Sequence, residues 1–164
     1  MSKYILLLIA LAVVLIYLFF PRGDDAGQIE AVFNEIRDAA GNKDTEGVTE
    51  HFSLQYKDEY GQYKDEYGAG YPAVKGIIRN AFQEYDGIQA SYSGLSAVFG
   101  ENEYGEKEAA ANVDILVTGF KSGIPYILIG SEGSPDNITV TLKKSGISGW
   151  KIAGVEGLDT PDDY

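Results

Sequence analysis

The chain has 164 residues, with 25 acidic against 13 basic residues and a net charge of −12 at pH 7, which excludes a nucleic-acid phosphate backbone as a partner. It contains no cysteine, so disulfides, thiol catalysis and cysteine-ligated zinc are excluded. With 45% apolar residues, twelve tyrosines and seven phenylalanines, the sequence has the material for one globular core.

The N-terminal segment is an uncharged apolar run. Residues 4–20 carry no charge, and as a helix they would extend about 25 Å, which is just enough to span the hydrocarbon core of a bilayer. Pro21 would end this helix. We therefore expect residues 1–23 to be a membrane anchor. A cleaved signal peptide would have a shorter apolar region with a small-residue cleavage site, and a type IV pilin would have a Gly-Phe processing site; the sequence has neither.

The charges beside the apolar run predict its orientation. Lys3 and the α-amino group precede the run, whereas Arg22 is offset by Asp24 and Asp25. The positive-inside rule then places the N-terminus in the cytoplasm. We expect a single-pass protein whose domain lies on the extracytoplasmic side, in the bacterial envelope.

Three helices are predicted after the anchor. Asp25 and Gln28 have the spacing of a capping box, and apolar residues recur at helical intervals until Gly41. A short helix begins at Asp44, and a third begins at Pro72 and closes at Asp86-Gly87. The apolar stripe of the third helix comprises Val74, Ile77, Ile78, Ala81, Phe82 and Tyr85.

From Ile88 onward the hydrophobic period changes from helical to two, which indicates strands. The predicted strands lie at 88–92, 111–117, 126–129, 138–142 and 150–155, separated by glycine-rich turns. The sequence therefore predicts an α+β domain over residues 24–157, with three helices on one face of a meandering antiparallel sheet, followed by an acidic tail at residues 158–164.

This element order, with a last strand that begins Gly149-Trp150-Lys151-Ile152, resembles the nuclear-transport-factor-two-like superfamily, which includes ketosteroid isomerase and the SnoaL-type polyketide cyclases. The resemblance covers residues 25–157. It implies a cone-shaped, cystatin-like fold whose interior holds a small apolar ligand. It also implies that the open sheet face can form a homodimer.

Few residues are candidates for the cone pocket, and none is predicted to be catalytic. Tyr92, Tyr126 and Trp150 are the pocket candidates. Asp114 is the best candidate for a general base, but period two places it on the face opposite to Val113, away from the helices. Trp150 also alternates with Lys151, so it is expected to face the core.

An identical seven-residue repeat occupies residues 55–61 and 62–68. Because seven residues are nearly two helical turns, the repeat would place several tyrosines on one stripe. The stripe, Tyr56, Tyr60, Tyr63 and Tyr67, is a candidate surface for a protein partner, and a tolerated duplication is the alternative. Leu116 and Phe120 are further interaction candidates, on the otherwise polar sheet face.

No metal or cofactor is expected. His51 is the only histidine, and the acidic clusters at 58–66 and 101–108 do not match a calcium loop. The sequence favours a membrane-tethered, extracytoplasmic, non-enzymatic domain that binds a protein partner or a small apolar ligand. A tethered isomerase or cyclase-like enzyme and a purely structural subunit remain alternatives.

Overall fold

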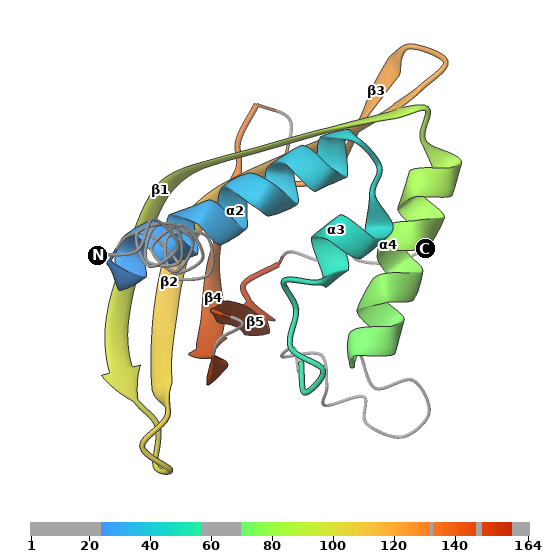
Figure 1. Cartoon of the computed structure of the whole chain (residues 1–164). Helices are drawn as coiled ribbons and strands as arrows, with labels where there is room; N and C mark the ends of the chain where they lie inside the picture. The colour runs from blue at the N-terminus through green and yellow to red at the C-terminus, as the bar shows by residue number, and fades with distance from the viewer. Residues whose placement is uncertain (1–23, 57–69, 132, 147–148, 159–164) are drawn as a thin grey trace, which may run out of the picture.

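The computed structural model describes residues 24–56, 70–131, 133–146 and 149–158. Its elements in chain order are α2 (Asp25–Gly41), α3 (Thr45–Thr49), α4 (Tyr71–Glu84), β1 (Gly87–Glu101), β2 (Lys107–Lys121), β3 (Ile124–Ile129), β4 (Asp136–Lys144) and β5 (Trp150–Glu156). In Figure 1, α2 lies along the inner side of the curved β1–β2 hairpin, and α4 stands near the far end of α2. The predicted α+β class, with helices against a curved antiparallel sheet, is confirmed.

The first helix is capped one residue earlier than predicted. The Asp24 side chain, and not that of Asp25, accepts a hydrogen bond from the Gly27 N–H at 2.9 Å. The Asp25 carboxylate is thereby free to bind two lysines, Lys144 from β4 and Lys107 from β2, the latter at 3.3 Å. These ion pairs join the start of α2 to the sheet.

Strand β2 organises the sheet. It pairs with β1 along one edge, and along the other edge with β4 over residues 108–115 and then with β3 over residues 117–121. The predicted meander is therefore wrong at one step, because β4 pairs with β2 instead of β3. The fifteen residues of β2 give it the length to take two partners in succession.

A β-bulge changes the phase of β1. The register shifts between Ser93 and Ser96, so that two β1 residues lie opposite Val113 of β2. Gly94, in the bulge, has a φ of 63°, a conformation that glycine adopts without strain. Before the bulge the even-numbered residues face the helices, namely Ile88, Ala90 and Tyr92. After the bulge the odd-numbered residues Leu95 and Ala97 pack against the core. The bulge therefore keeps the concave face of a bent strand apolar.

The core lies between α2 and the middle of the sheet. Ile29 of α2 is fully buried, as are Val113 of β2 and Leu142 of β4. Trp150 is 2% exposed, which confirms its predicted position in the core, and its ring packs edge-on against that of Phe99 at a centroid distance of 5.8 Å.

Among the helices of the described residues, none is both long enough and apolar enough to cross a bilayer. The predicted anchor at residues 1–23 lies outside the described part of the chain.

The C-terminal end of α4 packs against Gly119 of β2. A Cβ atom at this position would lie 2.6 Å from the Tyr85 ring. We predict that Gly119→Ala lowers the free energy of unfolding by about 1 to 3 kcal/mol through overpacking. Urea titration followed by the fluorescence of Trp150, the single tryptophan, measures this.

Gly100→Ala is the matched control, because a Cβ at Gly100 meets nothing within 4 Å. In the Tyr85→Ala background the cost of Gly119→Ala should largely disappear. An equal cost in both backgrounds would contradict the assignment of Tyr85 as the clashing group.

Candidate ligand-binding cavity

The helices and the concave face of the sheet enclose a cavity of about 420 Å³. This volume lies in the range of small-molecule sites, about 300 to 1,000 Å³. Its lining is almost entirely apolar: Phe33, Ile36, Ala40, Val48, Phe52, Val74, Ile77, Ile78, Ala81, Phe82, Ile88, Ala90, Ile115, Val117, Leu128, Ile129, Ile138, Val140, Ile152, Val155 and Leu158, with Arg37, Tyr56, Ser91 and Tyr92 as the polar members. Leu158, predicted to begin the tail, is therefore part of the domain.

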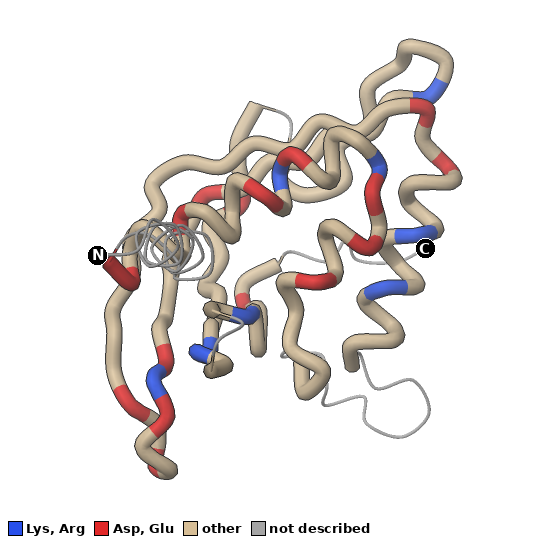
Figure 2. The backbone as a smooth tube through the Cα atoms, in the orientation of Figure 1, with Lys and Arg blue, Asp and Glu red and all other residues tan. Residues whose placement is uncertain are grey.

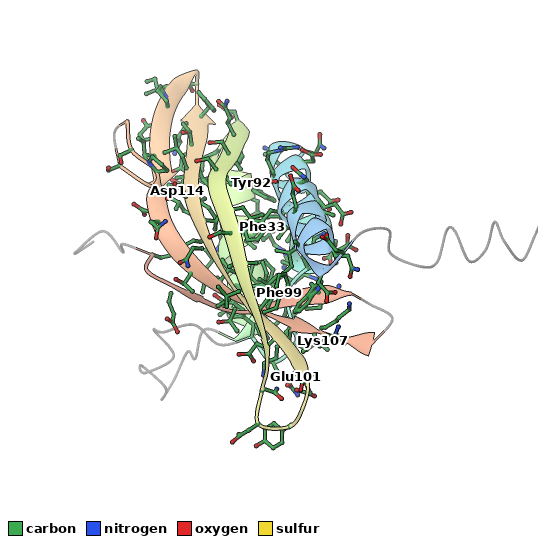
Figure 3. All side chains as sticks on the ribbon, turned by 90° about the vertical axis from the view of Figure 1, so that its left-hand side faces the viewer. Phe33, Tyr92, Phe99, Glu101, Lys107 and Asp114 are labelled. Atoms are coloured by element: carbon green, nitrogen blue, oxygen red, sulfur yellow. The ribbon has the colours of Figure 1, made fainter. Side chains whose placement is uncertain are left out.

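Helix α2 forms the firmly packed wall. Phe33 is 5% exposed, and its ring lies 5.5 Å from that of Tyr92 on β1, at an angle of 47°. Figure 3 shows both residues in the layer between α2 and the sheet. The helical spacing of Phe33, Ile36 and Ala40 carries the apolar stripe of α2 from the core to the cavity.

Helix α4 forms the opposite, lightly packed wall. None of its residues is buried, and Ile77 lines the cavity while remaining 65% exposed. The cavity therefore reaches the protein surface beside α4. The C-terminal end of the helix is held by Tyr85 against Gly119, and its first turns by an ion pair between Lys75 and Glu46 at 2.6 Å.

Tyr92 and the side chains around it form the polar corner of the cavity. The Tyr92 hydroxyl donates a hydrogen bond to Asn34 Oδ1 at 2.9 Å. Burial, with the nearby Glu30 carboxylate, raises the pKa of Tyr92, so the phenol stays neutral at physiological pH. Arg37 is the only charged residue among the described lining residues, and its side chain is 42% exposed. Its Nε binds Asp38 Oδ1 at 2.9 Å.

No carboxylate or imidazole belongs to the lining that the structure describes. Asp114 lies on the opposite side of the sheet from α2, as predicted, where Asp114 Oδ1 accepts a hydrogen bond from Asn137 Nδ2 at 2.7 Å (Figure 3). The cavity as described therefore lacks the general base that an isomerase of this fold would need.

Of the three pocket candidates, only Tyr92 lines the cavity. Trp150 is a core residue and borders a separate surface hollow with Asp25 and Lys107. Tyr126 is 44% exposed on β3, and its ring packs on that of Tyr85 at 5.9 Å. Strand β3 reaches the cavity with Leu128 and Ile129, whereas Tyr126 lies farther along the strand, opposite Gly119, where it packs on Tyr85 instead.

The residues predicted to form an interaction surface lie in different parts of the molecule. Tyr56 is 5% exposed and lines the cavity, with its ring edge-on to Phe52 at 5.3 Å, so the prediction that it belongs to a surface stripe is wrong. Its companions Tyr60, Tyr63 and Tyr67 lie outside the described residues. Leu116 and Phe120 are half-buried on the outer sheet face, where they pack against glycines at 130 and 87.

His51 lies outside the cavity. It is 7% exposed, and its Nε2 lies 3.2 Å from Glu35 Oε2 and 3.7 Å from Glu50 Oε1. Burial lowers the pKa of His51, against the two carboxylates. The described residues contain no group of three or more side chains suited to a metal ion.

Sequence reasoning missed Arg37, which lines the cavity, and Asn34, which binds the hydroxyl of the lining residue Tyr92. A signal was present, because the two residues are three positions apart on α2, next to the apolar stripe of Phe33 and Ile36. A polar pair at this spacing marks the border of a buried helix face. The pattern does not show whether that border meets solvent or a cavity.

Comparisons with known proteins identify the fold. No family model matches the chain, and no curated protein matches its sequence. Several solved structures are similar to it. A candidate scytalone dehydratase from Novosphingobium aromaticivorans is 19% identical, with 82% of each chain covered and a TM-score of 0.62.

A nuclear transport factor 2-like superfamily protein from Salmonella enterica is 12% identical, covering 85% of this chain and 92% of that one, with a TM-score of 0.60. An NTF2-like protein with a cystatin-like fold from Novosphingobium aromaticivorans is 16% identical, covering 80% and 79%, with a TM-score of 0.56. The described domain therefore has the cystatin-like fold of nuclear-transport-factor-2-like proteins. At these identities the likeness concerns the fold alone.

His51 makes stability depend on pH between 7 and 5. Because its pKa is lower in the folded state than its ordinary value of 6.5, the unfolded chain binds the proton more tightly. The contribution of His51 is present above pH 6.5 and is lost as the pH falls through that value. We predict that the free energy of unfolding decreases from pH 7 to pH 5.

Urea titrations at several pH values test this. The His51→Gln chain should show a flatter profile, since the chain has no second histidine. Parallel profiles for the two chains would contradict the prediction.

Proposed function

We propose that this protein is a membrane-tethered, extracytoplasmic domain that binds a small apolar ligand in its cavity without transforming it. The observation that carries the proposal is the lining: a 420 Å³ space walled by aliphatic and aromatic side chains, whose polar members are two tyrosines, one serine and one arginine. Burial of apolar surface in such a space supplies affinity, and a few polar groups orient the ligand.

The proposed membrane anchor is argued from the sequence. Residues 4–20 have the length and apolarity of a single span, and the charges around them favour a cytoplasmic N-terminus. The first helix of the domain begins at Asp25, only a few residues after this run. The domain would then lie close to the extracytoplasmic face of the membrane, where small apolar molecules concentrate.

A tethered isomerase or cyclase is the second candidate, suggested by the fold. Such an enzyme needs a base placed against the ligand, and the described lining offers none. A homodimer through the outer sheet face would use Leu116 and Phe120, but both side chains already pack on their own sheet. Ligand binding is therefore the function that the site supports best.

Photoaffinity labelling of the full-length chain in lipid nanodiscs tests ligand binding. We predict that a ten-carbon alcohol carrying a diazirine labels peptides of α2, α4 and β1, and that excess decanol prevents this labelling. Ala90 lines the cavity, so Ala90→Trp should fill it and reduce the labelling several-fold. Mass spectrometry of the labelled peptides provides the measurement.

Ala110→Trp is the matched control. Ala110 is exposed on β2, outside the cavity, so this change should leave the labelling unaltered. Labelling that is insensitive to Ala90→Trp, in a chain whose melting remains cooperative, would refute a ligand site in the cavity.

Membrane topology is tested separately with C-terminal reporter fusions. We predict that alkaline phosphatase fused after Tyr164 is active, because it acts only outside the cytoplasm, and that a cytoplasm-specific reporter at the same position is silent. Removal of residues 1–23 should abolish membrane association. The reverse reporter pattern would overturn the proposed orientation.

A further inference from the structure

The single charged residue in the described lining of the cavity is a cation, although the chain is acidic and the carboxylates of Glu30 and Asp38 lie near the same corner. The chain carries 25 acidic and 13 basic residues, yet the described lining contains one cation, Arg37, and no anion. Figure 2 shows acidic residues spread over α2, α3 and the β1–β2 hairpin. A positive group on the wall of an otherwise apolar space, in so acidic a molecule, points to a ligand that carries negative charge.

The polar corner has the donors that a single anionic group requires. Asn34 and Arg37 are three positions apart on α2, so their side chains emerge from neighbouring sites on the helix surface. Tyr92 holds Asn34 by its carbonyl oxygen, which leaves the Asn34 amide N–H groups without a bonded partner among the described residues. Burial raises the pKa of Tyr92, so no phenolate competes for the guanidinium.

Arg37 retains free donors of its own. Its Nε and one Nη atom both bind the same oxygen of Asp38, at 2.9 and 2.8 Å. The Asp38 side chain is 65% exposed and does not line the cavity, and an exposed pair of this kind is weak. The remaining N–H groups of the guanidinium can therefore donate hydrogen bonds to a second carboxylate from the cavity side.

We propose that the ligand is an amphipathic carboxylate: an apolar chain or ring system fills the cavity, and one carboxylate is bound by Arg37 with help from the Asn34 amide, which lies beside Tyr92. This inference rests on the proposed function and specifies its ligand class. A carboxylate fits better than a phosphate, because a single guanidinium offers a bidentate match to one carboxylate, whereas a phosphate dianion needs more positive charge than this corner provides.

Paired photoaffinity probes test the inference on the full-length chain in nanodiscs. Diazirine-bearing decanoic acid is compared with the decanol probe of the same chain length. We expect the acid to label the cavity peptides, and Arg37→Gln to reduce labelling by the acid about tenfold, the loss expected for a charge-assisted hydrogen bond. Labelling by the alcohol should change less than about twofold, since its binding depends on apolar contacts.

Three further variants separate charge from packing. Arg37→Lys should retain part of the labelling by the acid, because it keeps the positive charge. Asp38→Asn should increase it, because it removes the carboxylate that competes for Arg37. Arg79→Gln, which removes an exposed arginine of α4 outside the lining, should have no effect.

The outcomes distinguish the two proposals. If the alcohol labels the cavity but labelling by the acid is unaffected by Arg37→Gln, the amphipathic carboxylate is refuted and ligand binding stands. An equal decrease for Arg37→Gln and Arg79→Gln also refutes it, because the effect is then one of net charge. If neither probe labels the cavity, the proposed function itself fails.

Discussion

The structure depends on the pairing of one long strand with three others. Strand β2 pairs with β1 along one edge and successively with β4 and β3 along the other. It therefore joins the two halves of the sheet. The bulge at Gly94 bends β1 and shifts its phase, which keeps apolar side chains on the concave face along the whole strand.

The two walls of the cavity differ in how they are held. Helix α2 is anchored by buried residues such as Ile29 and by the ion pairs of Asp25 with two strands, whereas α4 has no buried residue and is held mainly at its C-terminal end. Local stability follows the number of buried contacts, so α4 is the wall expected to open first. Arg37 lies on the firm wall. A polar group on a rigid helix can orient a ligand while the other wall adapts to its shape.

The fold alone does not determine what such a cavity does. The proteins that share this architecture at 12 to 19% identity include a candidate scytalone dehydratase and proteins named only for their fold. Their likeness to this chain is in the arrangement of the backbone. In this chain the chemistry follows from the lining. Asp114, the carboxylate nearest to the middle of β2, is on the opposite side of the sheet from α2, and His51 is a buried residue outside the lining. The described lining holds no carboxylate and no imidazole.

Local patterns predicted most of the secondary structure, because helix and strand periods depend on neighbours a few residues apart. The helix from Asp25 to Gly41 and the short helix after Asp44 were recognisable from caps and apolar spacing. The position of the first cap was missed, since Asp24 and Asp25 are equally good cap residues. Only the tertiary ion pairs with Lys107 and Lys144 show which of the two is engaged elsewhere.

The sequence by itself determined the class of the domain, the burial of Trp150 and the absence of any cysteine-based or multi-histidine site, because composition and alternation suffice for these. Only the tertiary structure decided which tyrosines reach the cavity. Tyr92 keeps the alternation of Ile88 and Ala90 because the bulge begins only after it, whereas Tyr126 lies opposite Gly119 and packs on Tyr85 instead of lining the cavity. The outcome for Tyr126 depends on strand pairing between residues distant in sequence, a long-range choice that no local pattern encodes.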